Sequence, residues 1–449
     1  MLTLFPTSRS ARTATLKILA GLVALSLAAC QDSAAPMADP AGGPPDLSLV
    51  QNVMTLVQKH YVEPVPNDTL VNHALKGMLN GLDPHSDYLD PSEYELLKSD
   101  TTGEFGGIGI ELALKNGVPT VISPIDGTPA AAAGIAPGDL IVKIDGQPTD
   151  KMPLESIVGR LRGQAGTSVK LTILRGSLAP FDVALTRRVI HAASVKSGLE
   201  KNNIGYIRIT NFQETTASEF AAALDLLNRQ TAKHPAGLVL DLRNNPGGLL
   251  DSTIDVAGDL LDGGTVVTTK GRESDDDHVY AASPWGDRIP GIRIAVLING
   301  ASASAAEILA GALQDNHRAT VIGTRSFGKG SVQTIIPLNG EGALRLTTAR
   351  YYTPSGHSIQ DQGIMPDIAI AAPKDQQVPN ATSFHEGDLP GALRNTGSLA
   401  NAAPPSAGVA PQPEEEGPDE TPIDSTLIGT AKDLQLETAL EFLGHTPVK

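Results

Sequence analysis

The 449-residue sequence predicts a multi-domain α/β protein with a separate strand-rich module. Continuous apolar runs at residues 236–242, 294–298 and 319–322 are typical of strands buried on both faces, and helical segments follow the first two runs. Residues 103–189 have strand-like alternation between glycine-rich turns, which indicates a mainly-β module. Residues 47–100 have a helical pattern, so a helical segment precedes both of these parts.

One serine and one lysine are placed by this pattern where they can meet. Ser304 falls in the first turn of the helix that follows the strand Ile294–Ile298, and Lys329 lies on a glycine-flanked loop after the next strand. A lysine serves as a general base only when it is neutral, and burial away from other cations lowers its pKa toward neutrality. The neighbouring Phe327 would exclude water. The pattern therefore favours a serine nucleophile that is activated by lysine.

Two other interpretations of Ser304 stay open on the pattern alone. The sequence Ser304-Ala305-Ala306-Glu307 also matches a capping box, in which the serine only caps the helix. Ser302 stands two residues earlier in the same turn and competes for the role of nucleophile. The stretch lacks the Gly-x-Ser-x-Gly of a hydrolase elbow, so spacing does not separate the two serines.

The same stretch resembles the catalytic block of the carboxyl-terminal processing proteases, the tail-specific serine peptidases of the S41 type. It contains their small-residue serine turn, a DxxRA element at residues 315–319 and FGKGxVQ at residues 327–333, and the resemblance extends over about residues 47–371. The resemblance implies that Ser304 is the nucleophile, that Lys329 is the general base and that Gln333 orients the lysine. Ser302 is then a packing or capping residue, and the α/β core is crotonase/Clp-like.

A second glycine-rich turn, Arg243-Asn244-Asn245-Pro246-Gly247-Gly248, follows the apolar run at residues 236–242. Consecutive glycines can direct free amides at a ligand oxygen, which acyl transfer needs where the oxyanion develops. The resemblance implies that Gly247 or Gly248 is one donor of this oxyanion hole and that the amide of Ala305 is the other. The alternative is a tight strand-to-helix turn without a ligand. A phosphate loop is disfavoured because no Gly-Lys-Ser/Thr follows.

The strand-rich module resembles a PDZ domain, with strands at residues 169–174 and 181–185 and a helix at Leu154–Leu161. The resemblance implies a loop whose amides receive the terminal carboxylate of a peptide, which is then added as an extra strand. Arg162 follows the helix and matches an arginine that such proteases use to couple this domain to the active site, although a solvated cation at a helix end is the alternative. The loop consists of Gly106, Gly107, Ile108 and Gly109.

The N-terminal residues predict export. Three cations precede an apolar segment at residues 18–29, which is too short to span a membrane. The segment ends in Leu27-Ala28-Ala29-Cys30, which resembles a bacterial lipobox with Cys30 as the lipidated residue. We therefore expect a periplasmic protein with a lipid anchor in the outer membrane, because Gln31 gives no inner-membrane retention signal. The alternative is an ordinary signal peptide cut near Ala29, with an incidental Cys30 as the only cysteine.

Composition narrows the expected partners. The formal net charge is −16, and nothing basic in the sequence invites nucleic acid. No HExxH or clustered Cys/His set is present, so no metal or other cofactor is expected, and His85 in the turn at residues 82–86 is interpreted as structural. The expected partners are protein substrates with exposed C-termini, an adaptor protein, and the membrane through the lipid anchor.

These observations predict a periplasmic serine endopeptidase that captures C-termini through the PDZ domain and cleaves by a Ser/Lys dyad through an acyl-enzyme. The alternative is a proteolytically silent PDZ scaffold, against which the intact Ser304, Lys329 and Gln333 argue. A stretch rich in Pro, Ala, Gly and Glu at residues 372–422 predicts disorder, and residues 430–443 predict a terminal helix. The expected parts are a signal peptide (1–29), a tether (30–45), a helical segment (46–102), an inserted PDZ domain (103–189), an α/β protease core (190–371) and a disordered tail with a terminal helix (372–449).

Overall fold

The computed structural model describes residues 47–115, 117–125, 127–150, 152–231, 234–377, 384–395, 397, 423 and 426–444. The chain divides into two compact units, Met1–Val65 and Pro66–Lys449. In the first unit the structure describes the helix α1 (Ser48–His60), which buries none of its residues. Its apolar side chains include Leu49, Val50 and Val53, which are exposed. Cys30, the signal peptide and the tether lie outside the described residues.

The α/β core is built on a six-stranded sheet in the order β10-β11-β12-β15-β16-β19. All neighbouring strands are parallel except β10 and β11. Leu238 and Leu240 pack into one core cluster while Val239 packs into another, so the central strands are apolar on both faces. This explains the apolar runs without alternation. The strands are β10 (Val195–Glu200), β11 (Ile204–Ile209), β12 (Gly237–Asp241), β15 (Ile294–Ile298), β16 (Ala319–Gly323) and β19 (Ile368–Ala369).

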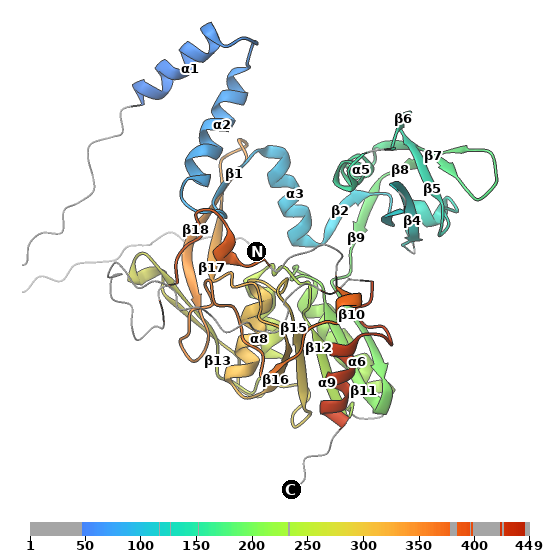
Figure 1. Cartoon of the computed structure of the whole chain (residues 1–449), viewed down its shortest axis with the longest axis vertical. Helices are drawn as coiled ribbons and strands as arrows, with labels where there is room; N and C mark the ends of the chain where they lie inside the picture. The colour runs from blue at the N-terminus through green and yellow to red at the C-terminus, as the bar shows by residue number, and fades with distance from the viewer. Residues whose placement is uncertain are drawn as a thin grey trace, which may run out of the picture. The chain divides into compact units, whose positions relative to one another are not determined.

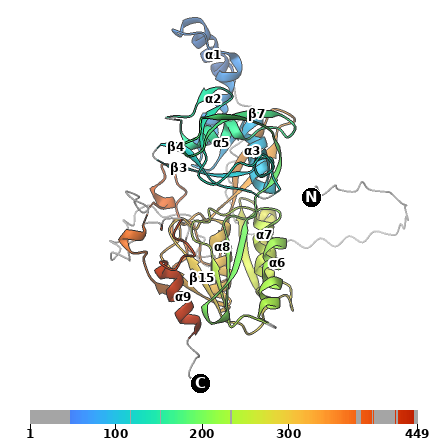
Figure 2. The same ribbon diagram turned by 90° about the vertical axis from the view of Figure 1, so that its right-hand side faces the viewer.

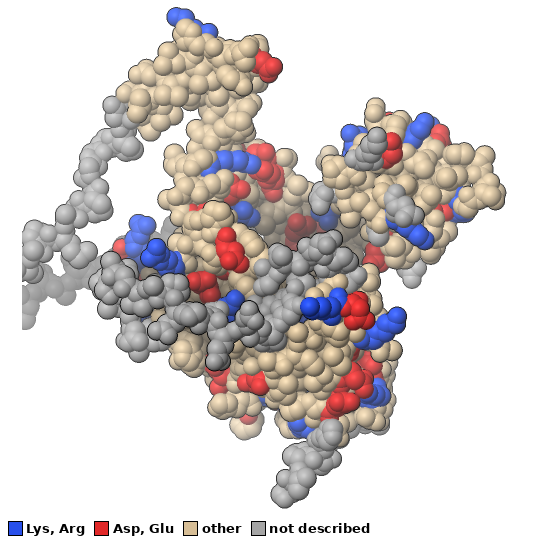
Figure 3. Space-filling model, in the orientation of Figure 1, with Lys and Arg blue, Asp and Glu red and all other residues tan. Residues whose placement is uncertain are grey.

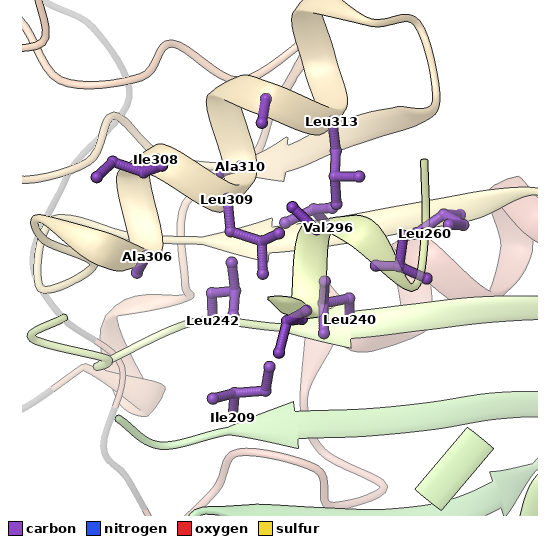
Figure 4. Packing of buried hydrophobic residues seen from close by; sticks show 14 of the residues in the cluster. Ile209, Leu240, Leu242, Leu260, Val296, Ala306, Ile308, Leu309, Ala310 and Leu313 are labelled. Atoms are coloured by element: carbon purple, nitrogen blue, oxygen red, sulfur yellow. The ribbon is translucent and has the colours of Figure 1, made fainter. Parts of the chain in front are cut away.

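Helices cover both faces of this sheet (Figure 1). Three of them pack on one face, where Leu309 and Leu313 of α8 lie over Leu240 and Val296 of the strands (Figure 4). The fourth, α9, packs on the other face, and Figure 2 shows it on the side of the sheet opposite to α6 and α7. The helices expected after the first two apolar runs are confirmed. The helices are α6 (Thr216–Gln230), α7 (Leu250–Gly258), α8 (Ala305–Asp315) and α9 (Leu434–Gly444).

A second, antiparallel sheet holds the strands that follow the lysine loop. Its order is β1-β18-β13-β14, and β17 also pairs with β18. Because Asp87 of β1 lies opposite Arg345 of β18, the turn at residues 82–86 is fixed beside these strands. The strands are β1 (Asp87–Leu89), β13 (Thr265–Gly271), β14 (His278–Ala281), β17 (Ser331–Pro337) and β18 (Ala343–Tyr352).

The strand-rich module has a hydrophobic core of its own, which includes Ile141, Ile157 and Leu171. The chain enters it through β2 and leaves it through β9, and these two strands pair with Gly106 opposite Val189. Adjacent entry and exit strands are what an inserted domain requires. The elements are β2 (Glu104–Gly107), β3 (Ile110–Lys115), β4 (Val118–Pro124), α4 (Pro129–Ala132), β5 (Leu140–Ile144), β6 (Gln147–Pro148), α5 (Leu154–Leu161), β7 (Ser168–Leu174), β8 (Phe181–Thr186) and β9 (Arg188–His191).

Two helices of the second unit precede the module, α2 (Asn67–Asn80) and α3 (Pro91–Thr102). The start of α3 is fixed by Asp90, whose side chain accepts hydrogen bonds from the amides of Ser92 and Glu93. The Glu93 side chain in turn accepts from the amide of Asp90, which completes a capping box. The helical pattern expected over residues 47–100 is therefore present.

The C-terminal part of the chain is more ordered than its composition predicts. The terminal helix is present as α9, and the short 3₁₀ helix η4 (Glu386–Asp388) lies in a segment, residues 384–395, that was expected to be disordered. The buried groups of this part include charged and polar side chains, among them Glu386, Asp433 and Gln435. Composition counts such residues as solvated, so it misses the specific partners that bury them.

Charged side chains of both signs are interspersed on the face drawn in Figure 3. Apolar side chains gather in three interior clusters, two in the α/β core and one in the strand-rich module. Within the described ranges, no helix combines the length and the apolar character that crossing a bilayer requires.

Candidate active site

Ser304 lies at the N-cap position of α8, just after the turn that follows β15. Its φ of 53° and ψ of −114° are rare for a residue other than glycine, so the turn is strained. The residue is 8% exposed, and its side chain forms a hydrogen bond with that of Tyr351 on β18. Burial raises the pKa of Tyr351 to about 12, and the hydrogen bond opposes that rise. No sequence pattern pointed to Tyr351, because its contact with the serine depends on the packing of two distant elements.

The structure separates the two serines of this turn. Ser302 is fully buried, and its hydroxyl donates to the carbonyl of Leu242 at 2.8 Å and accepts from the amide of Asn299 at 3.0 Å. These bonds tie β12 to the turn after β15, so the hydroxyl of Ser302 is used in the structure of the turn. This matches the packing role that the family resemblance implied for Ser302.

The carboxylate of Glu307 joins the serine turn to the lysine loop. It accepts hydrogen bonds from the amides of Ser304 at 2.7 Å and Lys329 at 2.9 Å, and from the Ser326 hydroxyl and the Gly328 amide, both at 2.6 Å. Complete burial raises the pKa of Glu307 to about 7, although the four hydrogen bonds oppose this shift. The capping pattern predicted only the bond to Ser304, because the other three donors follow after the next strand.

Lys329 lies on the loop between β16 and β17. The backbone of this loop is fixed to the serine turn, because the amide of Phe327 donates to the carbonyl of Ser302 at 3.0 Å. Burial lowers the pKa of Lys329, which is the direction that a general base needs. In the part of the chain that the structure describes, no hydrogen bond joins the Lys329 amine to Ser304. The lysine loop and the serine turn are thus joined through the backbone, without a hydrogen bond between the side chains of Lys329 and Ser304.

Gln333 lies on β17, next to a register shift between Val332 and Gln333 in its pairing with β18. Its side-chain amide donates to the hydroxyls of Ser331 at 3.0 Å and Thr347 at 3.2 Å. The lysine-orienting contact that the resemblance implied is not among these bonds. In this structure Gln333 therefore supports the start of β17, and Lys329 is fixed through its backbone instead.

The glycine turn lies against Ser304. A Cβ atom on Gly247 would lie 2.8 Å from Cβ of Ser304, and the φ of Gly247 is 104°, so only glycine fits there without strain. The amide of Gly247 donates to Oδ1 of Asn245 at 2.8 Å. By contrast, the amides of Gly248 and Ala305 have no acceptor among the residues described. Of the two glycines, Gly248 therefore has the free amide, as Ala305 does at the start of α8.

A fully buried arginine precedes the glycine turn. The guanidinium of Arg243 donates to both carboxylate oxygens of Asp241, at 3.0 and 2.6 Å, and to both of Asp433, at 2.8 and 2.6 Å. A fifth bond of 3.0 Å goes to Oε1 of Gln435. Two carboxylates and a neutral side-chain amide thus accept hydrogen bonds from all the N–H groups of the buried guanidinium. Asp433 and Gln435 come from the C-terminal part of the chain, and no sequence pattern pointed to them.

The strand-rich module contains a cavity of about 150 Å³ between β3 and α5. Gly107, Ile108 and Gly109 of the predicted carboxylate loop line it, whereas Gly106 does not. The carbonyl of Gly106 instead accepts from the amide of Gly163 at 3.0 Å. Apolar side chains from both walls complete the cavity, which suits an apolar side chain at the end of a peptide. They are Phe105, Ile110, Leu112, Val158 and Leu161.

Arg162 also lines this cavity, at the C-terminal end of α5. Its Nη1 lies 3.3 Å from Oδ1 of Asp100 on α3, and its guanidinium stacks over the ring of Phe105 at 4.5 Å. The side chain therefore contacts the peptide cavity and the helix that precedes the module. Arg162 is therefore not a freely solvated cation, and the coupling role that the resemblance implied stays a prediction.

Comparison with known proteins agrees with the fold. Family models match residues 203–370 (Peptidase family S41), residues 120–175 (PDZ domain) and residues 19–93 (Activating protease CtpB N-terminal domain). The carboxy-terminal-processing protease of Bartonella bacilliformis is 49% identical over 324 residues, or 72% of this chain and 74% of that protein. A probable CtpA-like serine protease of Staphylococcus epidermidis is 35% identical over 347 residues, or 76% and 70% of the two chains.

The solved photosystem II D1 C-terminal processing protease is 31% identical, with a TM-score of 0.43 and a match that covers 72% of this chain and 87% of that one. The fold and the family matches define a serine-type peptidase with an inserted PDZ domain. The chain belongs to the carboxy-terminal-processing proteases of peptidase family S41. The predicted family and the predicted multi-domain α/β fold are confirmed.

Proposed function

We propose that this peptidase cleaves proteins through an acyl-enzyme on Ser304, with Lys329 as the general base. The observation that carries the proposal is the carboxylate of Glu307, which binds the backbone amides of both residues. A serine in a strained turn and a buried lysine with a lowered pKa are thereby fixed as one unit. Strained turns present the nucleophile in other hydrolases, and a neutral amine accepts its proton.

The chemistry follows from the groups at this turn. Neutral Lys329 takes the proton from Oγ of Ser304 as that oxygen attacks the substrate carbonyl carbon. The negative charge on the carbonyl oxygen is stabilised by the free amides of Gly248 and Ala305. When the C–N bond breaks, Lys329 returns the proton to the leaving amine and an ester remains on Ser304. Water then attacks the ester with Lys329 again as the base, which releases the product and restores the hydroxyl.

The PDZ domain would select the substrate. Its cavity combines apolar walls with the backbone of Gly107, Ile108 and Gly109, so it suits a free C-terminus with an apolar last residue. Arg162 at the edge of the cavity would report occupancy to α3 through Asp100. The adaptor protein among the expected partners would present substrates to this domain.

A fluorophosphonate probe tests the proposed chemistry. We expect it to label the full chain at Ser304, as located by mass spectrometry of the labelled peptide, and to label neither Ser304→Ala nor Lys329→Ala. Circular dichroism and thermal melting would show that both variants are folded. Absence of labelling in the wild type under conditions where a model peptide still binds would favour the silent PDZ scaffold instead.

We also propose a bacterial periplasmic location with a lipid anchor at Cys30, which lies outside the described residues. The support is the sequence Leu27-Ala28-Ala29-Cys30 after an apolar segment with preceding cations. Each buried methylene of an acyl chain contributes about 0.8 kcal/mol, so several chains hold a protein on a bilayer. Labelled palmitate should be incorporated into the wild type and not into Cys30→Ser, and the wild type should fractionate with outer membranes. A wild type without label would leave only an ordinary secreted protein.

A further inference from the structure

A buried carboxylate from residues 384–395 lies beside the loop that carries Lys329. Glu386 is 1% exposed and begins the short helix η4. Its amide donates to the carbonyl of Phe327 at 3.0 Å, two residues before the lysine. A glutamate is almost never fully buried without partners, so the groups around this carboxylate show what it does.

Two side chains hold the carboxylate of Glu386. Nε2 of His85 lies 2.9 and 2.8 Å from its two oxygens, and Nε2 of Gln360 donates to Oε1 at 3.1 Å. Oε1 of the same Gln360 accepts from the amide of Gly330 at 3.0 Å. Glu386 is therefore attached to the lysine loop on both sides of Lys329, through Phe327 and through Gly330.

His85 is itself fixed in the turn at residues 82–86. Its amide donates to Oδ1 of Asp83 at 2.9 Å, and its carbonyl accepts from Nε of Arg345 at 3.0 Å. The sequence suggested a structural role for His85, and the structure shows that its ring contacts the buried glutamate. The turn and residues 384–395 thus meet at one point beside the lysine loop.

The largest charge effects on Lys329 come from four side chains of the described residues, and the titratable ring of His85 contacts one of them. Burial lowers the pKa of Lys329, and the charge of Glu386 is the strongest of the effects that oppose burial. The charge of Arg345 on β18 lowers the pKa of Lys329, as burial does. The charges of Glu307 on α8 and Asp83 in the turn raise this pKa, as Glu386 does, but to a smaller extent. His85 faces Glu386 rather than the lysine. Loss of the proton from Lys329 is thus opposed mainly by the charge of one carboxylate, that of Glu386.

We infer that Glu386, fixed on both sides of Lys329, is a positioning residue whose charge opposes the loss of the lysine proton and so moves the activation of the dyad to higher pH. The inference rests on the proposed role of Lys329 as general base. His85 and Gln360 hold the carboxylate beside the lysine loop, so the fold sets the position of this charge. The C-terminal part of the chain, which lies beyond the matched peptidase region, thereby takes part in tuning the catalytic residue.

The pH dependence of fluorophosphonate labelling tests this inference, because it reports the dyad without a protein substrate. We compare the full-length wild type with Glu386→Gln and with the matched control Glu437→Gln, which removes a carboxylate from an exposed ion pair on α9. The labelling rate should rise with pH as Lys329 loses its proton. In Glu386→Gln the midpoint should lie about 1 pH unit lower, the low end of the shift expected from a neighbouring opposite charge. Glu437→Gln should keep the wild-type midpoint.

A folded Glu386→Gln with an unchanged midpoint would overturn the inference, and so would a midpoint that moves to higher pH. If Glu386→Gln does not fold, Glu386→Asp withdraws the carboxylate by one methylene and should lower the midpoint by a smaller amount. If neither variant folds, Glu386 only supports the loop and the inference is wrong. The proposed function is tested by a different variant. Labelling of Lys329→Ala at the wild-type rate would contradict the role of Lys329 as general base, whatever the midpoint of Glu386→Gln.

Discussion

The carboxylate of Glu307 accepts a hydrogen bond of 2.7 Å from the backbone amide of Ser304. The same carboxylate accepts three further hydrogen bonds from the lysine loop. Their donors are the Ser326 hydroxyl and the amides of Gly328 and Lys329. One buried side chain therefore joins the serine turn to the lysine loop, which come from different strand ends. The relationship makes Glu307 more than a helix cap, and it has consequences for stability, pH dependence and activity.

Replacing Glu307 with Gln should change the pH dependence of stability. Because burial raises the pKa of Glu307 from its ordinary value of 4.5 to about 7, its contribution to stability is full below pH 4.5 and is lost as the pH rises through about 7. Glu307→Gln should lower the free energy of unfolding by about 1–3 kcal/mol in acid. The NH2 group of the glutamine then faces a backbone N–H group and cannot accept its hydrogen bond. The wild type loses about 3 kcal/mol between acid and pH 8. The gap between the variant and the wild type should therefore close or change sign toward pH 8, which urea unfolding at several pH values measures. Glu437→Gln is the control, and a gap that is constant with pH would contradict the prediction.

Ser302→Ala and Ser304→Ala should have opposite effects on labelling. Ser302→Ala leaves the carbonyl of Leu242 and the amide of Asn299 without a buried partner, so we expect a loss of about 1–3 kcal/mol in unfolding free energy with labelling at Ser304 retained. Ser304→Ala loses the hydrogen bond with Tyr351, which costs about 0.5–1.5 kcal/mol, and it should lose all labelling. The two variants are compared by thermal melting and by probe incorporation. The reverse result would move the nucleophile to Ser302.

Gly247→Ala should abolish catalysis without loss of the fold. The added Cβ would lie 2.8 Å from Cβ of Ser304 and 2.9 Å from the carbonyl oxygen of Ala303, so the serine turn must shift. We expect a fall in labelling of at least about 100-fold, similar to the loss of an oxyanion donor. Gly291→Ala is the matched control, since its φ is also positive but nothing lies within 4 Å of the added atom. Equal labelling rates in the two variants would show that the glycine turn does not serve the serine.

Asp433→Ala should destabilise the core strongly. Arg243 would keep only Asp241 as a charged partner, and removal of one member of a buried ion network costs about 3–5 kcal/mol. Denaturant unfolding of Asp433→Ala against Glu437→Ala on the neighbouring helix measures this cost, because the pair of Glu437 with Lys201 is exposed and contributes at most about 1 kcal/mol. Similar losses in both variants would mean that α9 contributes through apolar packing alone.

The PDZ cavity should distinguish a free C-terminus from a blocked one. Peptides with an apolar last residue should bind the full-length protein more weakly after amidation, because the carboxylate no longer meets the amides near Ile108 and Gly109. Gly109→Ala should weaken binding of the free peptide, since its φ is 75° and an added Cβ would lie 2.3 Å from Cβ of Thr128. Fluorescence anisotropy with labelled peptides measures both effects. Equal binding of free and amidated peptides would show that this cavity does not select C-termini.

The elements that the sequence predicts well are those whose signal is local. Ile294–Ile298 is a strand with apolar residues at every position because both faces are buried, and α5 occupies the predicted range Leu154–Leu161. Ser304 and Lys329 were found because a turn and a glycine-flanked loop mark them, and the family resemblance then ranked Ser304 above Ser302. The structure adds the physical distinction, which is that the hydroxyl of Ser302 is used inside the turn.

The parts that were missed depend on contacts between distant residues. His85 and Glu386 are 301 positions apart, and Arg243 and Asp433 are 190 positions apart, so no periodic pattern links them. The Pro- and Glu-rich composition of residues 372–422 concealed the ordered segment with Glu386 inside it. Gln333 was assigned a contact with the lysine from the resemblance, whereas its side chain bonds to Ser331 and Thr347 in this structure.

The long sequence separation between Arg243 and Asp433 affects the order in which the core can form during synthesis. A ribosome makes Arg243 long before it makes Asp433, and until then the guanidinium has only Asp241 as its acidic partner. The face of the sheet that carries Val239 and Leu297 stays uncovered for the same period. The start of the glycine turn is thus completed only when a segment 190 positions further along the chain has been made. Folding of the core around Arg243 is in this way delayed until Asp433 is present.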